Sequence, residues 1–238
     1  MNTSVNFLLK KNTLKKEDPM AKIIGDSIAS LNKEVIRLKK EFVNNNPTSE
    51  AAVWYLSDMM VRRQLTNEEA VAIFNKFDKK LENFPYYKEI ATRVKGIEST
   101  LIGKTVPDFT SNKTIDGTDF TFSSLRGKYV LIDFWGVWCG PCVDEMPKVK
   151  EYGDKYADKL TILGINSGDT KEKMVNFLNK NGYDWQQVMS GKDTDNLVLK
   201  FNVAGFPTKF IIDPEGKILH RYLGNSEKAF VDLDKLLK

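Results

Sequence analysis

The chain has 238 residues and a formal net charge of +4 at neutral pH, with 41% hydrophobic and 29% charged residues. This composition is typical of a soluble globular protein with one large domain or two small ones. Because the lysines are scattered among acids, the charge gives little support to nucleic-acid binding. No apolar run reaches transmembrane length, and residues 5–9 are too short and too polar-flanked for a signal-peptide core. We expect a cytosolic protein, or one whose targeting segment has been removed, and membrane contact only through a removed anchor.

Residues 1–101 predict a tail followed by helices. Residues 1–18 are rich in lysine and asparagine without a period, and we interpret them as a flexible tail. Residues 19–101 place apolar side chains three and four positions apart, which indicates about four amphipathic helices. Helix-start signals stand at Asp18-Pro19 and in the capping box from Thr66 to Glu69. We interpret this segment as a packing and spacer module, with partner binding or dimerisation as the alternative.

Two of these helices carry predictions that the structure can test directly. The first has an apolar seam formed by Ile24, Ile28, Leu31, Val35, Leu38 and Phe42. The helix behind the capping box is expected to continue to Leu81 and to bury Val71, Phe74 and Phe77.

Residues 102–238 alternate strand and helix patterns and predict a second domain. The expected strands are 129–132, 160–165, 185–189, 208–212 and 217–223, and the expected helices follow 142, 170, 195 and 226. Asp116-Gly117 predicts an early hairpin, and Asp213–Gly216 predicts a second one near the end. Strands that alternate with helices and end in a hairpin and a helix predict an α/β domain. Its mixed central sheet should be covered by helices on both faces.

The two cysteines stand where a buried strand is expected to turn into a helix. Cys139 falls at the helix start, and Cys142 lies one turn later on the same face. Free N–H groups and the positive end of the helix dipole favour a thiolate there, which should lower the pKa of the Cys139 thiol. Pro141 lacks an N–H but sits in the first turn, where none is needed. We predict that Cys139 is the exposed nucleophile and that Cys142 is the resolving thiol beneath it.

Other uses of a cysteine pair fit less well. A zinc site needs about four ligands, whereas the chain has two cysteines and one histidine. A haem attachment site needs a histidine after Cys142, where Val143 stands. We therefore expect no metal and no cofactor besides a redox-active Cys139–Cys142 disulfide.

The sequence Trp-Cys-Gly-Pro-Cys after Ile-Asp-Phe-Trp resembles the active site of the thioredoxin superfamily, and the resemblance runs from about Ile102 to the end. The entrance from Gly103 to Phe109, the early hairpin and the extra segment before Gly205 resemble the TlpA-like (AhpC/TSA-related) branch of bacterial thiol-disulfide oxidoreductases. The resemblance implies a thioredoxin fold and a location in the periplasm or cell envelope, with the cytoplasm as the alternative. It also implies protein disulfide substrates and an upstream thiol donor, such as a membrane-bound reductase.

The resemblance also assigns roles around the cysteine pair. It makes Pro207 a cis-proline that faces the cysteines, and the backbone of Phe206 beside it pairs with the substrate chain. Trp138, Gly140 and Pro141 complete the expected substrate-binding rim.

Two acids are candidate proton carriers. The resemblance places Asp133 buried beneath Cys142, and Glu145 lies on the same helix face three residues after Cys142. The alternatives are a hydrogen-bonded buried group for Asp133 and a solvated first-turn acid for Glu145.

These features predict a thiol-disulfide oxidoreductase, and the Gly-Pro between the cysteines favours the reductase direction. One alternative is a peroxiredoxin-like peroxidase, but its Pro-x-x-x-Thr/Ser-x-x-Cys motif is absent, because Ile132 and Gly136 stand at the matching positions. The other is a non-catalytic envelope adaptor that binds a partner through its helices.

Overall fold

The computed structural model describes residues 13–14, 18–192 and 195–238. Most of the predicted tail, residues 1–18, therefore lies outside the described residues. Internal contacts divide the chain into two compact units, one up to Ile90 and one from Ala91 onward. The two units are described separately below, and the predicted domain boundary at residue 102 stays a prediction.

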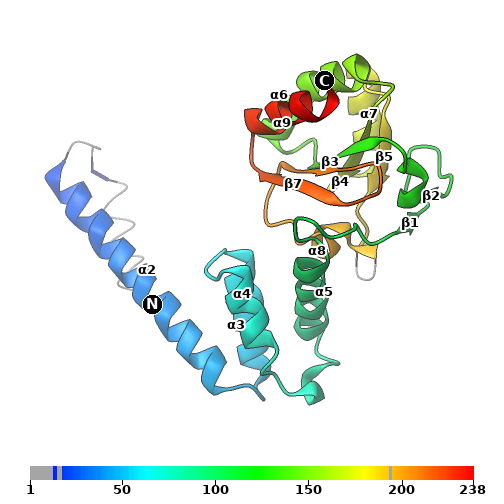
Figure 1. Ribbon diagram of the computed structural model, residues 1–238. Helices are drawn as coiled ribbons and strands as arrows, with labels where there is room; N and C mark the ends of the chain where they lie inside the picture. Colours follow the sequence, from blue (N-terminus) through cyan, green and yellow to red (C-terminus); the bar gives the residue numbers. More distant parts are fainter. Residues whose placement is uncertain (1–12, 15–17, 193–194) are drawn as a thin grey trace. The chain divides into compact units, whose positions relative to one another are not determined.

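The first unit is helical, as its sequence periodicity predicts. Asp18 caps the first long helix by accepting a hydrogen bond from the Met20 amide, and the capping box between Thr66 and Glu69 is present. The first two helices pack against each other and share the ion pair between Lys39 and Asp58 at 2.7 Å. The elements are α2 (Pro19–Asn45), α3 (Glu50–Val61), α4 (Asn67–Phe74), the 3₁₀ helix η1 (Lys79–Leu81) and the start of α5 (Pro85–Ser99) (Figure 1).

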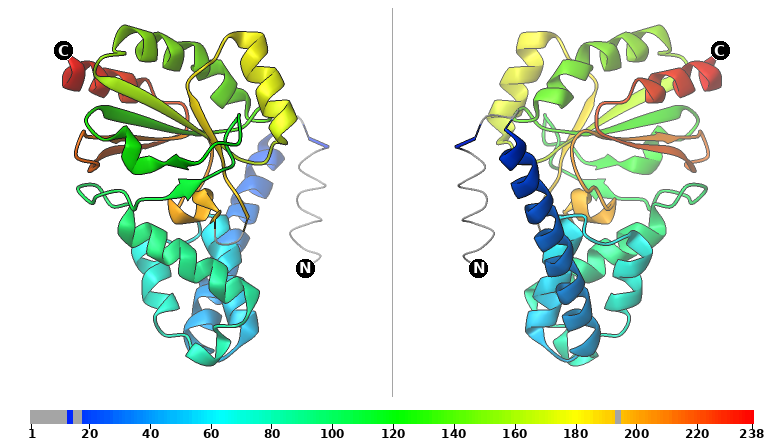
Figure 2. Two further views of the ribbon diagram at one scale, coloured as in Figure 1. Left: turned by 90° about the vertical axis from the view of Figure 1, so that its right-hand side faces the viewer. Right: turned by 90° about the vertical axis from the view of Figure 1, so that its left-hand side faces the viewer.

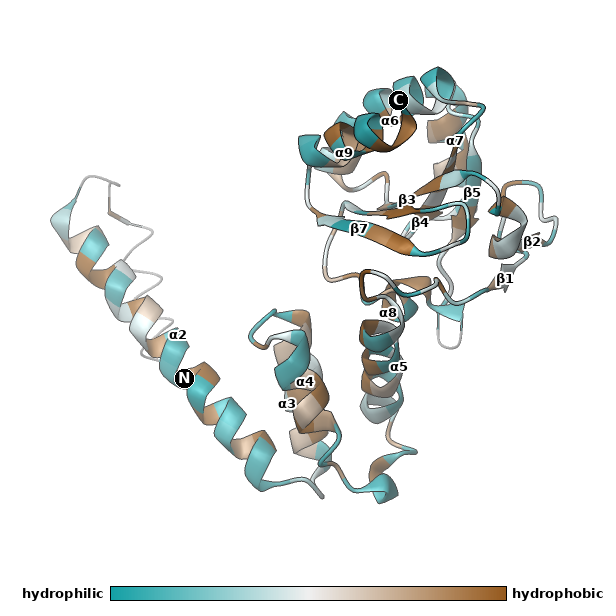
Figure 3. Ribbon diagram, viewed as in Figure 1, coloured by the Kyte–Doolittle hydropathy of each residue, from teal (hydrophilic) through white to brown (hydrophobic). Residues whose placement is uncertain are grey.

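One prediction for this unit is wrong. The helix behind the capping box ends at Phe74, because Asp78 donates its backbone N–H to Pro47 and caps η1 with its side chain. The seam of α2 is only partly buried: Ile24 is covered, whereas Val35, Leu38 and Phe42 are exposed. Apolar and polar residues consequently alternate along the visible surface of α2 (Figure 3).

The second unit is built on one five-stranded sheet with the strand order β5-β4-β3-β6-β7. The strands β5, β4 and β3 run parallel, β6 runs antiparallel to β3, and β7 runs antiparallel to β6, which confirms the predicted mixed sheet. The strands are β3 (Tyr129–Trp135), β4 (Leu160–Asn166), β5 (Gln186–Met189), β6 (Thr208–Ile212) and β7 (Ile218–Leu223). The remaining elements are β1 (Thr110–Ser111), β2 (Phe120–Thr121), η2 (Phe122–Leu125), α6 (Gly140–Lys155), α7 (Lys171–Asn181), α8 (Leu197–Lys200) and α9 (Glu227–Leu237).

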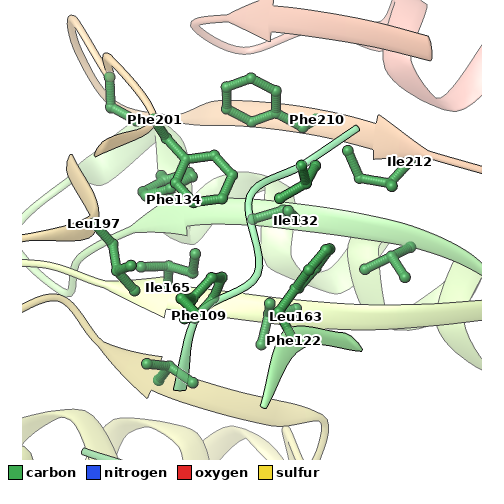
Figure 4. Close-up of a cluster of buried hydrophobic side chains, with 14 of the residues drawn as sticks. Phe109, Phe122, Ile132, Phe134, Leu163, Ile165, Leu197, Phe201, Phe210 and Ile212 are labelled. Atoms are coloured by element: carbon green, nitrogen blue, oxygen red, sulfur yellow. The ribbon is translucent and has the colours of Figure 1, made fainter. Parts of the chain in front are cut away.

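The alternation of side chains along β3 assigns the two faces of the sheet. Ile132 and Phe134 point into a core closed by the β1–β2 hairpin, η2 and α8 (Figure 4). Leu131 and Trp135 point the other way, into clusters covered by α6, α7 and α9. These helices lie together over that face in Figures 1 and 2. Asp133 belongs to the same face, so it lies under the helix that begins at the cysteines.

The last turns of α5 belong to this second unit. A Cβ on Gly96 would come within 2.5 Å of the carbonyl oxygen of Leu199 and 2.6 Å of that of Lys200, so only glycine allows α5 to lie this close to α8. In the part of the chain that the structure describes, no helix combines the length and the apolar character that crossing a membrane requires.

Candidate active site

The two cysteines form a disulfide at the N-terminus of α6. Cys139 is the N-cap residue, and its backbone carbonyl accepts hydrogen bonds from the amides of Cys142 and Val143. The Cys142 amide also lies 3.3 Å from the Cys139 sulfur. Cys139 keeps 5% of its surface exposed, whereas Cys142 is fully buried. The helix end therefore brings the Cys142 amide to the outer sulfur, an arrangement that stabilises a thiolate.

Trp138 forms an exposed flap beside the disulfide. Its side chain is held by a hydrogen bond of 2.8 Å from Nε1 to the Ser167 carbonyl, although 53% of the residue is exposed. A Cβ on Gly136 would lie 2.4 Å from that nitrogen, so the indole packs directly over the glycine backbone. The ring also meets Phe206 edge-on, with the ring centroids 5.1 Å apart.

The Phe206–Pro207 peptide bond is cis, as the resemblance implied. Phe206 is partly buried against the cluster that contains both cysteines, and Gly140 and Pro141 are exposed at the start of α6. Trp138, Gly140 and Pro141 thus stand beside the cysteines in the chain, and Phe206 packs against them; their role in substrate binding stays a prediction.

One supporting residue escaped the sequence analysis. Asp169, in the loop after β4, accepts hydrogen bonds from the Val137 amide at 2.7 Å and from Asn166 at 3.0 Å, and it pairs with Lys173. These contacts hold the turn that carries Trp138. Only the parallel pairing of β3 and β4 brings the two loops together, so the sequence alone gave no signal for this contact.

The two predicted acids come together around a buried lysine. Lys209 on β6 lies with its Nζ 2.6 Å from Glu145 Oε2 and 3.3 Å from Asp133 Oδ1, and its side chain is fully buried. Glu145 also accepts a hydrogen bond of 2.9 Å from the Ser226 amide through its other oxygen. Asp133 and Glu145 are 1% and 5% exposed, so Glu145 is not a solvated first-turn acid.

Burial sets the electrostatics of this group. Desolvation raises the pKa of Asp133 above the ordinary aspartate range, and the Lys209 ammonium offsets only part of that effect. For Lys209 desolvation acts against the charge, but the two carboxylates outweigh it and hold the lysine pKa above its ordinary value. Burial thus keeps the pKa of Asp133 raised even beside a cationic neighbour.

A signal for Lys209 was present in the sequence. It interrupts the apolar run Thr208–Ile212, and strand alternation places it on the face opposite to Phe210. A lysine directed at a covered sheet face needs an anionic partner. The partners became clear only with the pairing of Asp133 with Lys209 across β3 and β6.

A cysteine pair at a helix N-terminus, on a mixed sheet and beside a cis-proline, defines a thiol-disulfide oxidoreductase of the thioredoxin fold. Residues 102–221 match the AhpC/TSA family, and the chain belongs to this family. Within the described residues, no three or more histidine, cysteine or acidic side chains converge as metal ligands.

Similar proteins include thiol-disulfide oxidoreductases. The thiol-disulfide oxidoreductase ResA of Bacillus subtilis is 34% identical over 146 residues, which cover 60% of this chain and 79% of that protein. The thioredoxin domain of a thiol-disulfide oxidoreductase from Bacteroides vulgatus superposes with a TM-score of 0.53 at 26% identity, covering 58% of this chain and 99% of that domain. A disulfide isomerase-like structure from Bacteroides thetaiotaomicron gives a TM-score of 0.51 at 31% identity, covering 58% and 87%. The matches to these structures cover little more than half of this chain.

Proposed function

We propose that this oxidoreductase reduces disulfide bonds in protein substrates, with Cys139 as the nucleophile and Cys142 as the resolving thiol. The observation that carries this assignment is the asymmetry of the pair. Cys139 caps α6 and keeps 5% of its surface exposed, whereas Cys142 is fully buried. An incoming disulfide can reach only the outer sulfur, and the helix terminus stabilises the thiolate there.

The exchange proceeds in two displacements. The Cys139 thiolate attacks one sulfur of the substrate disulfide, which breaks that bond and releases the first substrate thiolate. The Cys142 thiolate then attacks Cys139 Sγ, breaks the mixed disulfide and releases the second substrate thiolate. Two electrons have moved to the substrate, which takes up two protons, and the protein is left with the Cys139–Cys142 disulfide seen in this structure. A dithiol donor restores the reduced pair by the same steps in reverse.

The second displacement needs a proton acceptor for Cys142, whose thiol is shielded from water. The candidate carboxylates are Asp133 on the sheet face that α6 covers and Glu145 on α6 itself. Such acid–base assistance typically contributes a factor of about 10²–10⁴. The substrate chain lies along Trp138 and Phe206, with the backbone beside Pro207 pairing with it as a short β-bridge.

The cell envelope is the proposed location, and a membrane-bound reductase is the proposed donor. The resemblance to the TlpA-like branch supports both. A membrane-impermeant thiol reagent applied to intact cells tests the location. Labelling of Cys139 before lysis places the site outside the cytoplasm, and labelling only after lysis contradicts the proposal.

Insulin reduction with a dithiol donor, together with two serine variants, tests the chemistry. We expect turnover by the wild-type protein and none by Cys139→Ser, whereas Cys142→Ser should accumulate mixed disulfides with the substrate. In the reduced protein Cys139 should be alkylated much faster than Cys142. Faster alkylation of Cys142 would reverse the assignment. Peroxide consumption without insulin reduction would point to the peroxidase alternative, and inactivity in both assays to the adaptor.

A further inference from the structure

A cleft of about 350 Å³ opens between the last turns of α5, the end of α8 and residues 107–109. α5 contributes Lys95, Gly96 and Ser99 to its lining, and these residues lie within one turn of that helix. All residues of the lining belong to the second unit, so the cleft is complete within that unit.

The floor of the cleft is aromatic. Phe109 and Phe201 both line it, and their rings meet edge-on with the centroids 6.0 Å apart. Both rings belong to the buried cluster of Figure 4, on the sheet face opposite to the cysteine pair. Only 9% of Phe109 and 2% of Phe201 is exposed, so the cluster fixes these rings in place. A fixed floor of two rings favours a ligand with a flat apolar body.

Two lysines from different walls line the same cleft. Lys95 comes from α5 and Lys200 from the end of α8. Among the described residues, neither ammonium group takes part in an ion pair or a side-chain hydrogen bond. Asp195, whose pKa is lowered by a hydrogen bond from Lys113 and also by the charge of Lys200, is already paired with Lys113. Both cations of the cleft can therefore bind an anionic group.

One acid also lines the cleft, but its carboxylate is used within the fold. Asp108 Oδ1 accepts hydrogen bonds from the Phe109 amide at 3.0 Å and from the Ser123 amide at 2.9 Å. Two ammonium groups and one carboxylate leave the lining with one excess positive charge. The Ser99 hydroxyl donates only a long hydrogen bond of 3.4 Å to the Gly96 carbonyl, so it can turn towards a ligand.

The spacing of the two helices is fixed at Gly96. A Cβ there would lie 2.5 Å from the Leu199 carbonyl oxygen and 2.6 Å from that of Lys200, so the backbones are in direct contact. The walls that carry the two lysines are therefore held at a constant separation. Preformed pockets for small organic ligands start at about 300 Å³, which suits a ligand with one fused ring system better than a peptide.

We propose that this cleft binds a small aromatic carboxylate, with the ring system on Phe109 and Phe201 and the carboxylate between Lys95 and Lys200. The binding site goes beyond the disulfide exchange and does not depend on it. The aromatic floor supplies the apolar contact, and the excess positive charge of the lining selects an anion.

A titration of the full-length oxidised protein with 2-naphthoate, followed by ¹H–¹⁵N NMR, tests the binding. We expect saturable shifts of the amides of Lys95, Phe109 and Phe201, with a Kd of about 10 µM to 1 mM for a ligand of this size. The neutral 2-naphthylmethanol has the same ring system without the charge. It should cause shifts at the same amides but bind about 10-fold more weakly.

Variants of the two lysines test the role of charge. Lys95→Met and Lys200→Met keep an apolar side chain, and each should raise the Kd for 2-naphthoate about 3- to 10-fold. The double variant should bind the acid no more tightly than the alcohol, while its affinity for the alcohol should stay unchanged. Lys104→Met is the matched control, because Lys104 is exposed near the cleft in the chain but does not line it. It should leave both affinities as they are.

Four results would overturn the proposal. The first is the absence of saturable shifts with 2-naphthoate up to about 10 mM. The second is a set of shifts centred away from the cleft, for example at Trp138. The third is an unchanged Kd in the double lysine variant, which would show that the cations do not bind the carboxylate. The fourth is tighter binding of an acetylated and amidated Asp-Phe-Asp peptide than of 2-naphthoate, which would assign the cleft to a protein partner.

Discussion

Replacement of the buried Asp133 by asparagine should give an oxidised protein whose stability, relative to that of the wild type, rises with the pH. Asparagine has nearly the same shape but no charge, and Glu145 remains to pair with Lys209. In the folded protein Asp133 keeps its proton to a higher pH than the value of about 3.9 expected in the unfolded chain. Over the interval between these two pKa values the folded state binds more protons, so the stability of the wild type falls with rising pH.

The magnitude follows from this linkage. Below about pH 4 both states of the wild type are protonated at Asp133, and the stabilising contribution is fully present. As the pH rises towards the folded pKa, the wild type should lose up to about 1.4 kcal/mol per pH unit relative to Asp133→Asn, and above that pKa the difference should level off. Asp144→Asn, which changes an exposed acid of α6, should show no such trend.

Urea denaturation of the three oxidised proteins from about pH 4 to about pH 9 measures these differences. A gap between wild type and Asp133→Asn that stays constant over this range would show that Asp133 does not change its charge on folding. A gap that moves in favour of the wild type would show that the ion pair with Lys209 outweighs burial, and the reasoning on the raised pKa would fail.

Two further predictions concern close packing in the second unit. Gly164→Ala should destabilise the fold by about 1–3 kcal/mol in urea denaturation, because the new methyl group displaces the buried amide of Gln187; an unchanged midpoint would show that this amide relocates freely. Residues 102–238 expressed alone should fold and keep disulfide exchange activity, because every residue of the proposed site lies there. They should denature at lower urea concentration than residues 91–238, which keep Gly96 packed on α8. Equal midpoints would assign the last turns of α5 no role in this unit, and an inactive 102–238 fragment would show that the helices complete the site.

The sequence was most informative where the signal is local. The cap at Asp18, the box between Thr66 and Glu69, and the strand-to-helix turn at Cys139 each depend on residues within one turn of one another. Backbone hydrogen bonds at a helix start are satisfied locally, so composition and spacing identify them. The correction in the helical unit comes from a contact that no local pattern contains, the bond from the Asp78 amide to the Pro47 carbonyl.

The residues of the site also fall into those that a local motif identifies and those that depend on distant contacts. The cysteines and Pro207 belong to short, specific motifs, whereas the surroundings of Asp133 depend on strand order. Because β3 lies between the parallel β4 and the antiparallel β6, Gly164 and Lys209 are the cross-strand neighbours of Asp133. The sequence shows an acid and a lysine in two apolar strands, but nothing in it pairs them.

Strand order and register therefore determine which charged groups surround the buried acids Asp133 and Glu145. A register shift of one residue between β3 and β6 would turn Lys209 to the opposite, wholly apolar face and leave two carboxyl groups without a cation. Both acids would then have to share protons, and the buried thiol would meet a neutral or strongly repelling partner. With the observed register, Lys209 pairs closely with Glu145 and lies within 3.3 Å of Asp133. The antiparallel pairing of β3 with β6, in the sheet directly beneath α6, thus decides which charged groups surround the two buried acids.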